Sequence, residues 1–126
     1  KESIDVKKTI FNNISKYNKQ GILCTNTSTL NINEIAESLQ NPNDKLRFVG
    51  THFFSPANIM KLLENVQSKY SNDQSIETIM KFGAKKLNKI TILSQNCYGF
   101  IGNRMLEGYG QEAAFCLEEG ATIQQI

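Results

Sequence analysis

Two polar segments of this chain directly follow predicted strands and hold side chains suited to acid/base chemistry. The first is Asn26-Thr27-Ser28-Thr29, and the second begins at His52, the one histidine of the sequence. An imidazole titrates near neutral pH and can take up and return a proton, while a serine hydroxyl can bind a substrate oxygen. Ligands of open parallel sheets bind beyond the carboxyl ends of the strands. If the two strands are parallel neighbours, Ser28 and His52 lie at the same edge, as a hydroxyl-binding site with a proton acceptor requires.

These residues also have a structural interpretation. A single histidine beside two phenylalanines is more often a packed side chain than a catalytic one. Ser28 and Asn26 could simply end a strand and cap a turn. The residue types alone therefore leave both alternatives open.

Apolar periodicity predicts helices alternating with strands, which is typical of a parallel α/β architecture. Phe53, Phe54, Met60 and the apolar faces of the helices are expected in the core. The segment 61–66 is ambiguous between strand and helix, because Leu62-Leu63 breaks strict alternation. The predicted helices are 5–19, a short one capped by Asn33, 73–87 capped by Asn72 or Asp73, 100–119, and one that starts at 122; the predicted strands are 22–25, 47–51 and 89–93, with a turn at 41–44.

Composition argues against several classes of function. The 14 basic and 12 acidic residues are interspersed and leave a net charge of +2, which is too balanced to indicate nucleic acid or a membrane surface. No apolar run approaches the ~20 residues that cross a bilayer. Cys24, Cys97 and Cys116 lie far apart, without a Cys-x-x-Cys or Cys/His cluster. We therefore expect no metal site, no nucleic-acid partner, no membrane span and a reducing compartment.

Three blocks of the sequence resemble the L-3-hydroxyacyl-CoA dehydrogenases of fatty-acid β-oxidation. They are Asn26-Thr-Ser-Thr-Leu30, His52-Phe-Phe-Ser-Pro-Ala-Asn-Ile-Met-Lys-Leu-Leu-Glu64 and Gly99-Phe-Ile-Gly-Asn-Arg-Met105. Ser55 and the stretch Asn96-Cys-Tyr-Gly99 are most similar to the peroxisomal multifunctional (bifunctional) branch. The resemblance implies an α/β fold: residues 1–94 as the C-terminal half of a Rossmann-type NAD-binding domain, and 95–126 as the start of an all-helical second domain. The chain is then expected to be an internal piece of a larger protein.

The resemblance also implies roles for four residues in catalysis. His52 matches the base that takes the proton of the 3-hydroxyl as hydride leaves C3 for NAD⁺. Glu64 matches the carboxylate that orients the imidazole, Ser28 the serine that contacts the substrate oxygen, and Asn103 the asparagine that reaches toward the same carbonyl. Without the resemblance, Glu64 is a surface carboxylate and Asn103 a solvent-facing helix residue.

Positions that match cofactor contacts are Glu2, Lys7, Asn26 and Ser28. Glu2 and Lys7 could instead be charged side chains exposed to solvent. The family often has asparagine where this chain has Ser55, which leaves a cofactor contact there in doubt. The Gly-rich phosphate loop G-x-G-x-x-G is absent from the sequence, and the resemblance places it upstream of Glu2.

The resulting hypothesis is NAD-dependent oxidation of (S)-3-hydroxyacyl-CoA to 3-ketoacyl-CoA within a larger multifunctional enzyme. The expected partners are this substrate and the remainder of the parent chain. The branch resemblance favours the peroxisome, with the mitochondrial matrix or cytoplasm as alternatives. The competing hypothesis is a non-catalytic binding or structural homologue built on the same fold.

Overall fold

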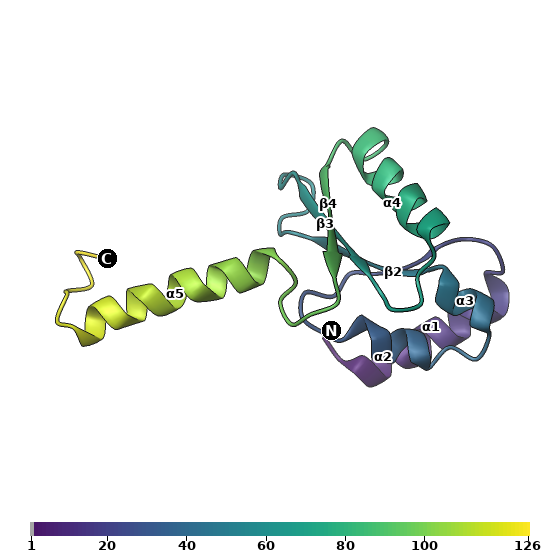
Figure 1. Ribbon diagram of the computed structural model, residues 1–126, viewed down its shortest axis with the longest axis horizontal. Coiled ribbons are helices and arrows are strands. Elements are labelled where there is room, and N and C mark those ends of the chain that lie inside the picture. The colour runs from purple at the N-terminus through teal and green to yellow at the C-terminus, as the bar shows by residue number, and fades with distance from the viewer. Residues whose placement is uncertain (1) are drawn as a thin grey trace.

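A four-stranded sheet with helices on both faces forms the body of the molecule, and the last helix extends from it as an arm (Figure 1). The computed structural model describes residues 2–126. The elements in chain order are α1 (Ile4–Tyr17), β1 (Leu23–Thr25), α2 (Ile32–Glu37), α3 (Pro42–Leu46), β2 (Phe48–Phe53), β3 (Leu62–Gln67), α4 (Asp73–Lys85), β4 (Ile90–Gln95) and α5 (Gly102–Glu118).

The strands lie in the order β1-β2-β3-β4, and their directions are mixed. β1 and β2 are parallel neighbours, with Leu23 opposite Phe48, which meets the condition for Ser28 and His52 to lie at one edge. β3 runs antiparallel to β2, and β4 runs parallel to β3. The parallel architecture expected from the alternation of helices and strands thus holds for the pairs β1–β2 and β3–β4, and the β2–β3 pair departs from it. The connection 54–61 contains no helix, and a parallel crossover needs a dozen or more residues, so β3 returns antiparallel.

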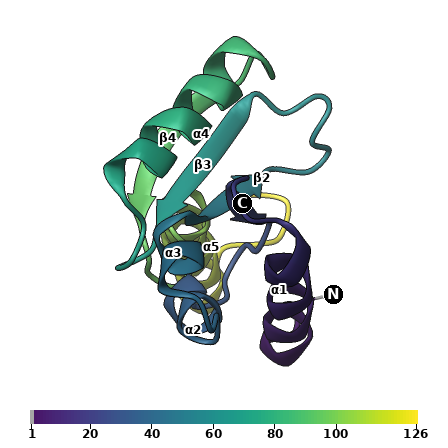
Figure 2. The ribbon, with the colours of Figure 1, turned by 90° about the vertical axis from the view of Figure 1, so that its right-hand side faces the viewer.

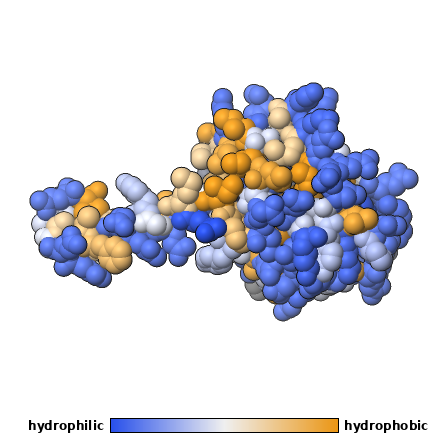
Figure 3. Space-filling view, in the orientation of Figure 1, coloured by the Kyte–Doolittle hydropathy of each residue, from blue (hydrophilic) through white to orange (hydrophobic). Residues whose placement is uncertain are grey.

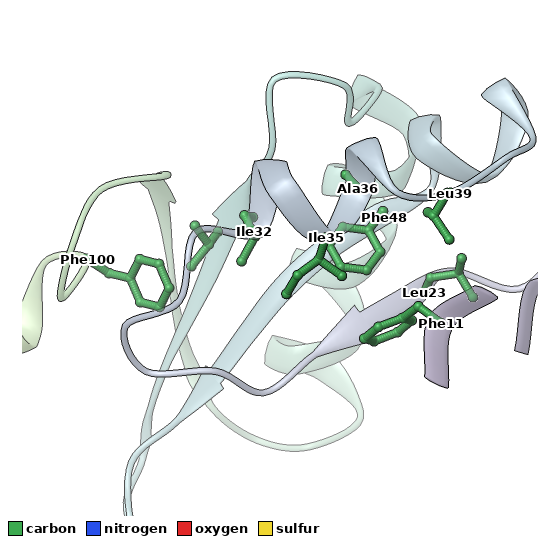
Figure 4. Packing of buried hydrophobic residues seen from close by; sticks show 9 residues of the cluster. Phe11, Leu23, Ile32, Ile35, Ala36, Leu39, Phe48 and Phe100 are labelled. Carbon is green, nitrogen blue, oxygen red and sulfur yellow. The ribbon is translucent and has the colours of Figure 1, made fainter. Parts of the chain in front are cut away.

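Successive residues of β2 point to opposite faces of the sheet and reach different cores. Phe48 packs in one cluster with residues of α1 and α2, and its ring meets Phe11 edge-on at 4.9 Å between centroids (Figure 4). Val49 packs against Ile76 and Ile79 of α4 in the second cluster. Figure 2 shows α4 lying along the sheet, with α1 to α3 at the other side. The even-numbered residues of β2, which include His52, thus face the α1–α2 side.

Local capping explains two differences from the sequence predictions. Asn31, not Asn33, caps α2, because its side chain accepts the backbone N–H of Asn33 and leaves Ile32 as a buried first residue. Residues 41–44 do not form a simple turn, because Asn41 caps the short helix α3, which has Pro42 in its first turn. Asn72 caps α4 as predicted. The ambiguous segment 61–66 lies almost entirely in strand β3, which spans Leu62–Gln67, and the chain from 122 to 126 contains a turn rather than a helix.

Several side chains expected in the core are exposed instead. The apolar stripe of α1 buries only Phe11, and Tyr17 is 87% exposed, because no described element packs against the outer side of this helix. Met60 is also exposed, in the connection that leads into β3. α5 has no buried residue, and Figure 3 shows apolar residues along this arm. Within residues 2–126, no helix is both long and apolar enough to cross a membrane.

Candidate active site

His52 and Glu64 lie directly opposite each other on β2 and β3. The antiparallel register pairs the two residues, so both side chains leave the same face of the sheet. The Nδ1 atom of His52 lies 2.6 Å from Oε2 of Glu64. His52 is only 6% exposed and Glu64 is fully buried. A buried carboxylate at this distance favours the imidazole tautomer that carries a proton on Nδ1, which leaves Nε2 as an acceptor.

The second oxygen of Glu64 binds the backbone at the start of α5. The N–H groups of Ile101 and Gly102 donate to Oε1 at 3.0 and 2.8 Å. These are among the N–H groups that a helix leaves without an internal partner at its N-terminus, where a negative charge is stabilised. Gly99 and Phe100 both have positive φ angles, +70° and +51°, and so turn the chain from β4 into this position. All three polar contacts of Glu64 are thus hydrogen bonds that suit a carboxylate.

Two phenylalanines enclose the imidazole. The ring of Phe54 lies 4.6 Å from the His52 ring, and that of the buried Phe100 lies 5.8 Å away, measured between centroids. Within residues 2–126, Nε2 of His52 makes no hydrogen bond, in contrast to Nδ1. The side chain is therefore fixed on one side and keeps a free nitrogen on the other.

The loop after β1 is held by Glu2, which precedes α1. Its carboxylate accepts the backbone N–H of Ser28 at 2.9 Å, the Ser28 hydroxyl at 3.4 Å and the Thr27 hydroxyl at 2.9 Å. Partial burial alone would raise the pKa of Glu2, but these hydrogen bonds and the charge of Lys7 lower the pKa below its usual value. Asn26 accepts the backbone N–H of Phe53 at 3.0 Å, which ties this loop to the end of β2. Parallel pairing of β1 and β2 thus brings both polar segments together.

A pocket of about 250 Å³ opens at this edge of the sheet. Its lining combines residues from the start of the chain, the loop after β1 and the end of β2, namely Glu2, Asn26, Ser28, His52, Phe53, Phe54 and Ser55. Residues 2–126 contain no cluster of three or more histidine, cysteine or acidic side chains that could hold a metal ion. The pocket offers a hydroxyl, a carboxylate and an imidazole, which can bind a hydroxyl-bearing substrate and accept its proton.

The predicted site residues fall into three groups. Glu2, Asn26, Ser28 and His52 line the pocket, together with Ser55. Glu64 lies behind the imidazole, and Asn103 donates its side-chain N–H to the backbone oxygen of Ser28 at 3.3 Å. Lys7 does not line the pocket, and its positive charge helps to lower the pKa of Glu2.

Sequence reasoning missed the backbone donors at Ile101 and Gly102 and the enclosing role of Phe54, which was assigned simply to the core. The two glycines of Gly99-x-x-Gly102 were the available signal, because glycine permits a close backbone approach.

Comparison with known proteins agrees with this geometry. Residues 1–97 match the family described as 3-hydroxyacyl-CoA dehydrogenase, NAD binding domain. The chain belongs to this family. Its members are NAD-dependent oxidoreductases, so the family resemblance, the Rossmann-like α/β fold class and NAD as the cofactor, all predicted from the sequence, are confirmed.

Relatives of the 3-hydroxyacyl-CoA dehydrogenase domain include multifunctional enzymes. The peroxisomal bifunctional enzyme of Homo sapiens is 45% identical over 126 residues, which cover 99% of this chain and 17% of that protein. The peroxisomal fatty acid beta-oxidation multifunctional protein MFP2 of Arabidopsis thaliana is 43% identical over 121 residues, covering 95% of this chain and 16% of that protein. The chain therefore spans about a sixth of the length of these relatives.

A solved structure of the same family has a closely similar fold. The (S)-3-hydroxybutyryl-CoA dehydrogenase PaaH1 of Ralstonia eutropha superimposes with a TM-score of 0.91 at 30% sequence identity, covering 100% of this chain and 44% of that chain. The fold of the whole chain is thus closely similar to part of an (S)-3-hydroxybutyryl-CoA dehydrogenase.

Proposed function

We propose that this chain supplies the acid/base centre for NAD-dependent oxidation of (S)-3-hydroxyacyl-CoA to 3-ketoacyl-CoA. The observation that carries the proposal is the buried contact of 2.6 Å between His52 Nδ1 and Glu64, which leaves Nε2 without a hydrogen bond among residues 2–126, in a side chain that lines the same pocket as Ser28. Membership in the 3-hydroxyacyl-CoA dehydrogenase family supplies the substrate class.

In the proposed reaction, Nε2 of His52 accepts the proton of the substrate 3-hydroxyl. The C3–H bond breaks at the same time, its electron pair leaves as hydride, and the C3–O bond becomes a carbonyl. When bound, NAD⁺ accepts this hydride. The imidazole becomes cationic, and the buried carboxylate of Glu64 stabilises that charge at Nδ1. A positioned base of this kind contributes about 10²–10⁴ in rate.

We assign the remaining site residues to substrate and cofactor. The Ser28 hydroxyl binds the substrate oxygen. Asn103 holds Ser28 in position through its hydrogen bond to the Ser28 backbone oxygen. Glu2, Asn26 and Lys7, with Ser28, form the nicotinamide-ribose side of the cofactor site. The carboxylate and amide oxygens of Glu2 and Asn26 suit the ribose hydroxyls, since both are hydrogen-bond acceptors. No Gly-rich loop for the pyrophosphate is present in the sequence.

The larger context belongs to the same proposal. Residues 1–94 act as part of the NAD-binding domain, and 95–126 begin a helical second domain. β4 ends at Gln95 and the family match at 97, which is consistent with a boundary there. We propose that the chain works within a longer multifunctional enzyme and in the peroxisome, because its relatives of this type are peroxisomal.

The test uses the full-length protein that carries this chain. NADH formation from NAD⁺ and a 3-hydroxyacyl-CoA is measured for the wild type and for His52→Gln, with Asn13→Gln, in the exposed part of α1, as the control. We expect a loss of at least 100-fold in kcat/KM for His52→Gln and none for the control. Undiminished turnover in His52→Gln would overturn the assignment. Absence of turnover in the wild type would favour a non-catalytic homologue.

A further inference from the structure

The first turn of α5 packs closely against the ring of Phe54, and the glycine at position 102 leaves room for this ring. A Cβ atom built on Gly102 would lie 2.6 and 3.0 Å from Cζ and Cε1 of Phe54, and 3.6 Å from Oε1 of Glu64. Contacts below 3.0 Å are essentially never made by real Cβ atoms, so either the Phe54 ring or the start of the helix would have to move. Both neighbours belong to the surroundings of His52.

The same turn of α5 also binds one of the two oxygens of Glu64. The N–H groups of Ile101 and Gly102 occupy Oε1, and Oε2 is left to accept from Nδ1 of His52. If the start of the helix moves away from Phe54 to make room for a methyl group, both backbone hydrogen bonds to Glu64 lengthen. Hydrogen bonds to a charged group weaken steeply with distance and angle. The carboxylate would then lose the contacts that hold it against the imidazole.

We propose that Gly102 is a positioning residue for the base. Its missing side chain seats the N-terminus of α5 on Glu64, and the two backbone N–H groups thereby fix the Glu64–His52 pair. None of the residues of α5 is buried. The first residues of the arm therefore make its polar contacts with the sheet domain, through the backbone N–H groups that bind Glu64 and through the side chain of Asn103. This inference rests on the proposed function, since it concerns the geometry of the same base.

The decisive experiment is a double-mutant cycle in the full-length protein. Gly102→Ala is introduced alone and together with Glu64→Gln, which keeps the volume of the side chain but removes its charge. We expect Gly102→Ala alone to reduce kcat about 10- to 100-fold, the range that corresponds to one hydrogen bond to a charged group, with KM for the acyl substrate within threefold. In the Glu64→Gln background, the same substitution should cost less than threefold, because the base is already impaired.

Gly83→Ala is a matched control on the other face of the sheet. A Cβ at Gly83 would lie 2.6 Å from Cγ2 of Thr91 and 2.9 Å from Cδ2 of Leu63, so the steric conflict is comparable to that at Gly102. This helical glycine contacts neither Glu64 nor His52. Gly83→Ala should lower the thermal stability and leave kcat within threefold. The inference would be overturned if Gly102→Ala reduced kcat equally in the wild-type and Glu64→Gln backgrounds. It would also be overturned if Gly102→Ala left kcat unchanged in the protein that retains Glu64.

A spectroscopic readout separates this inference from the proposed function. The Nδ1–H proton of His52 is assigned in the ¹H NMR spectrum of the full-length protein by its loss in His52→Gln. We expect the resonance to shift or broaden in Gly102→Ala and to stay in place in Gly83→Ala. If the wild type shows no dehydrogenase turnover, the proposed function fails, and this resonance still tests the positioning role. An unchanged resonance in Gly102→Ala would contradict it.

Discussion

Replacing Glu64 by glutamine changes one oxygen of the side chain to an NH₂ group and little else. Glu64 is fully buried, and its two oxygens have different partners. The amide oxygen of the glutamine can still accept the N–H groups of Ile101 and Gly102, which lie at 3.0 and 2.8 Å. The NH₂ group then faces Nδ1 of His52, which must become an acceptor. The ring proton is forced onto Nε2, and the imidazole loses its ability to take the proton of the substrate.

The size of the effect follows from these contacts. A base in the wrong tautomer loses most of the contribution of general-base catalysis, about 10²–10⁴ in rate, so we expect a fall of about 10³ in kcat/KM. Stability should change little, because each buried polar atom keeps a partner. Glu64→Ala, by contrast, leaves three donors without an acceptor, at about 1–3 kcal/mol each, and should destabilise the protein by at least about 3 kcal/mol.

The assay is NADH formation from a 3-hydroxyacyl-CoA by the full-length protein, with thermal unfolding measured in parallel. Glu77→Gln is the control, because Glu77 is an exposed carboxylate of α4 whose one ion pair within residues 2–126 is with Lys81. We expect the control to have wild-type kcat/KM. A Glu64→Gln protein with kcat/KM within threefold of the wild type would refute the tautomer argument.

Three further predictions concern stability and cofactor binding. Burial would raise the pKa of Asp44, but hydrogen bonds from Ser15 and Arg47 lower it below the usual 3.8. The ionised Asp44 therefore stabilises the folded protein above about pH 4, and this stabilisation is lost as the pH falls through the lowered pKa of the folded state. Asp44→Asn should speed hydrogen exchange of α1 and α3 about 100-fold at pH 7, because it breaks a buried ion pair with Arg47; the same acceleration at pH 3 would contradict this. Glu2→Gln should raise KM for NAD⁺ about 3- to 10-fold with little change in kcat, as measured by initial rates, since it weakens a site that holds the Ser28 loop. The isolated 126-residue chain should bind NADH at least 100-fold more weakly than the full-length protein in a fluorescence titration, because its sequence has no Gly-rich phosphate loop. Micromolar binding of NADH by the isolated chain would contradict this prediction.

The approach of Ser28 to His52 was predictable from the sequence. Both segments follow apolar strands, and parallel pairing of β1 and β2 places such segments at one edge. The antiparallel direction of β3 could also have been predicted from the sequence, since residues 54–61 are too few for a crossover to a parallel strand. That direction sets Glu64 opposite His52, a pairing that residue types alone did not reveal.

Other features depend on tertiary contacts that a local pattern does not contain. Asn31 and Asn33 are equally good helix caps by type, and burial of Ile32 selects the first. The stripe of α1 has helical spacing, yet spacing does not say whether a neighbour covers it. The donors to Glu64 at the start of α5 are backbone groups, which every residue carries, so the two glycines of Gly99-x-x-Gly102 indicated a close approach but not its partner.

A structure of the full-length protein bound to NAD⁺ and a 3-ketoacyl-CoA tests the central claim most directly. The distance to measure joins Nε2 of His52 to the 3-oxygen of the acyl group. We predict a value of about 2.6–3.2 Å, the range of a hydrogen bond to a general base, with Ser28 on the same oxygen. A 3-oxygen beyond about 5 Å from Nε2, with another side chain in hydrogen-bond contact, would contradict the assignment of His52 as the base.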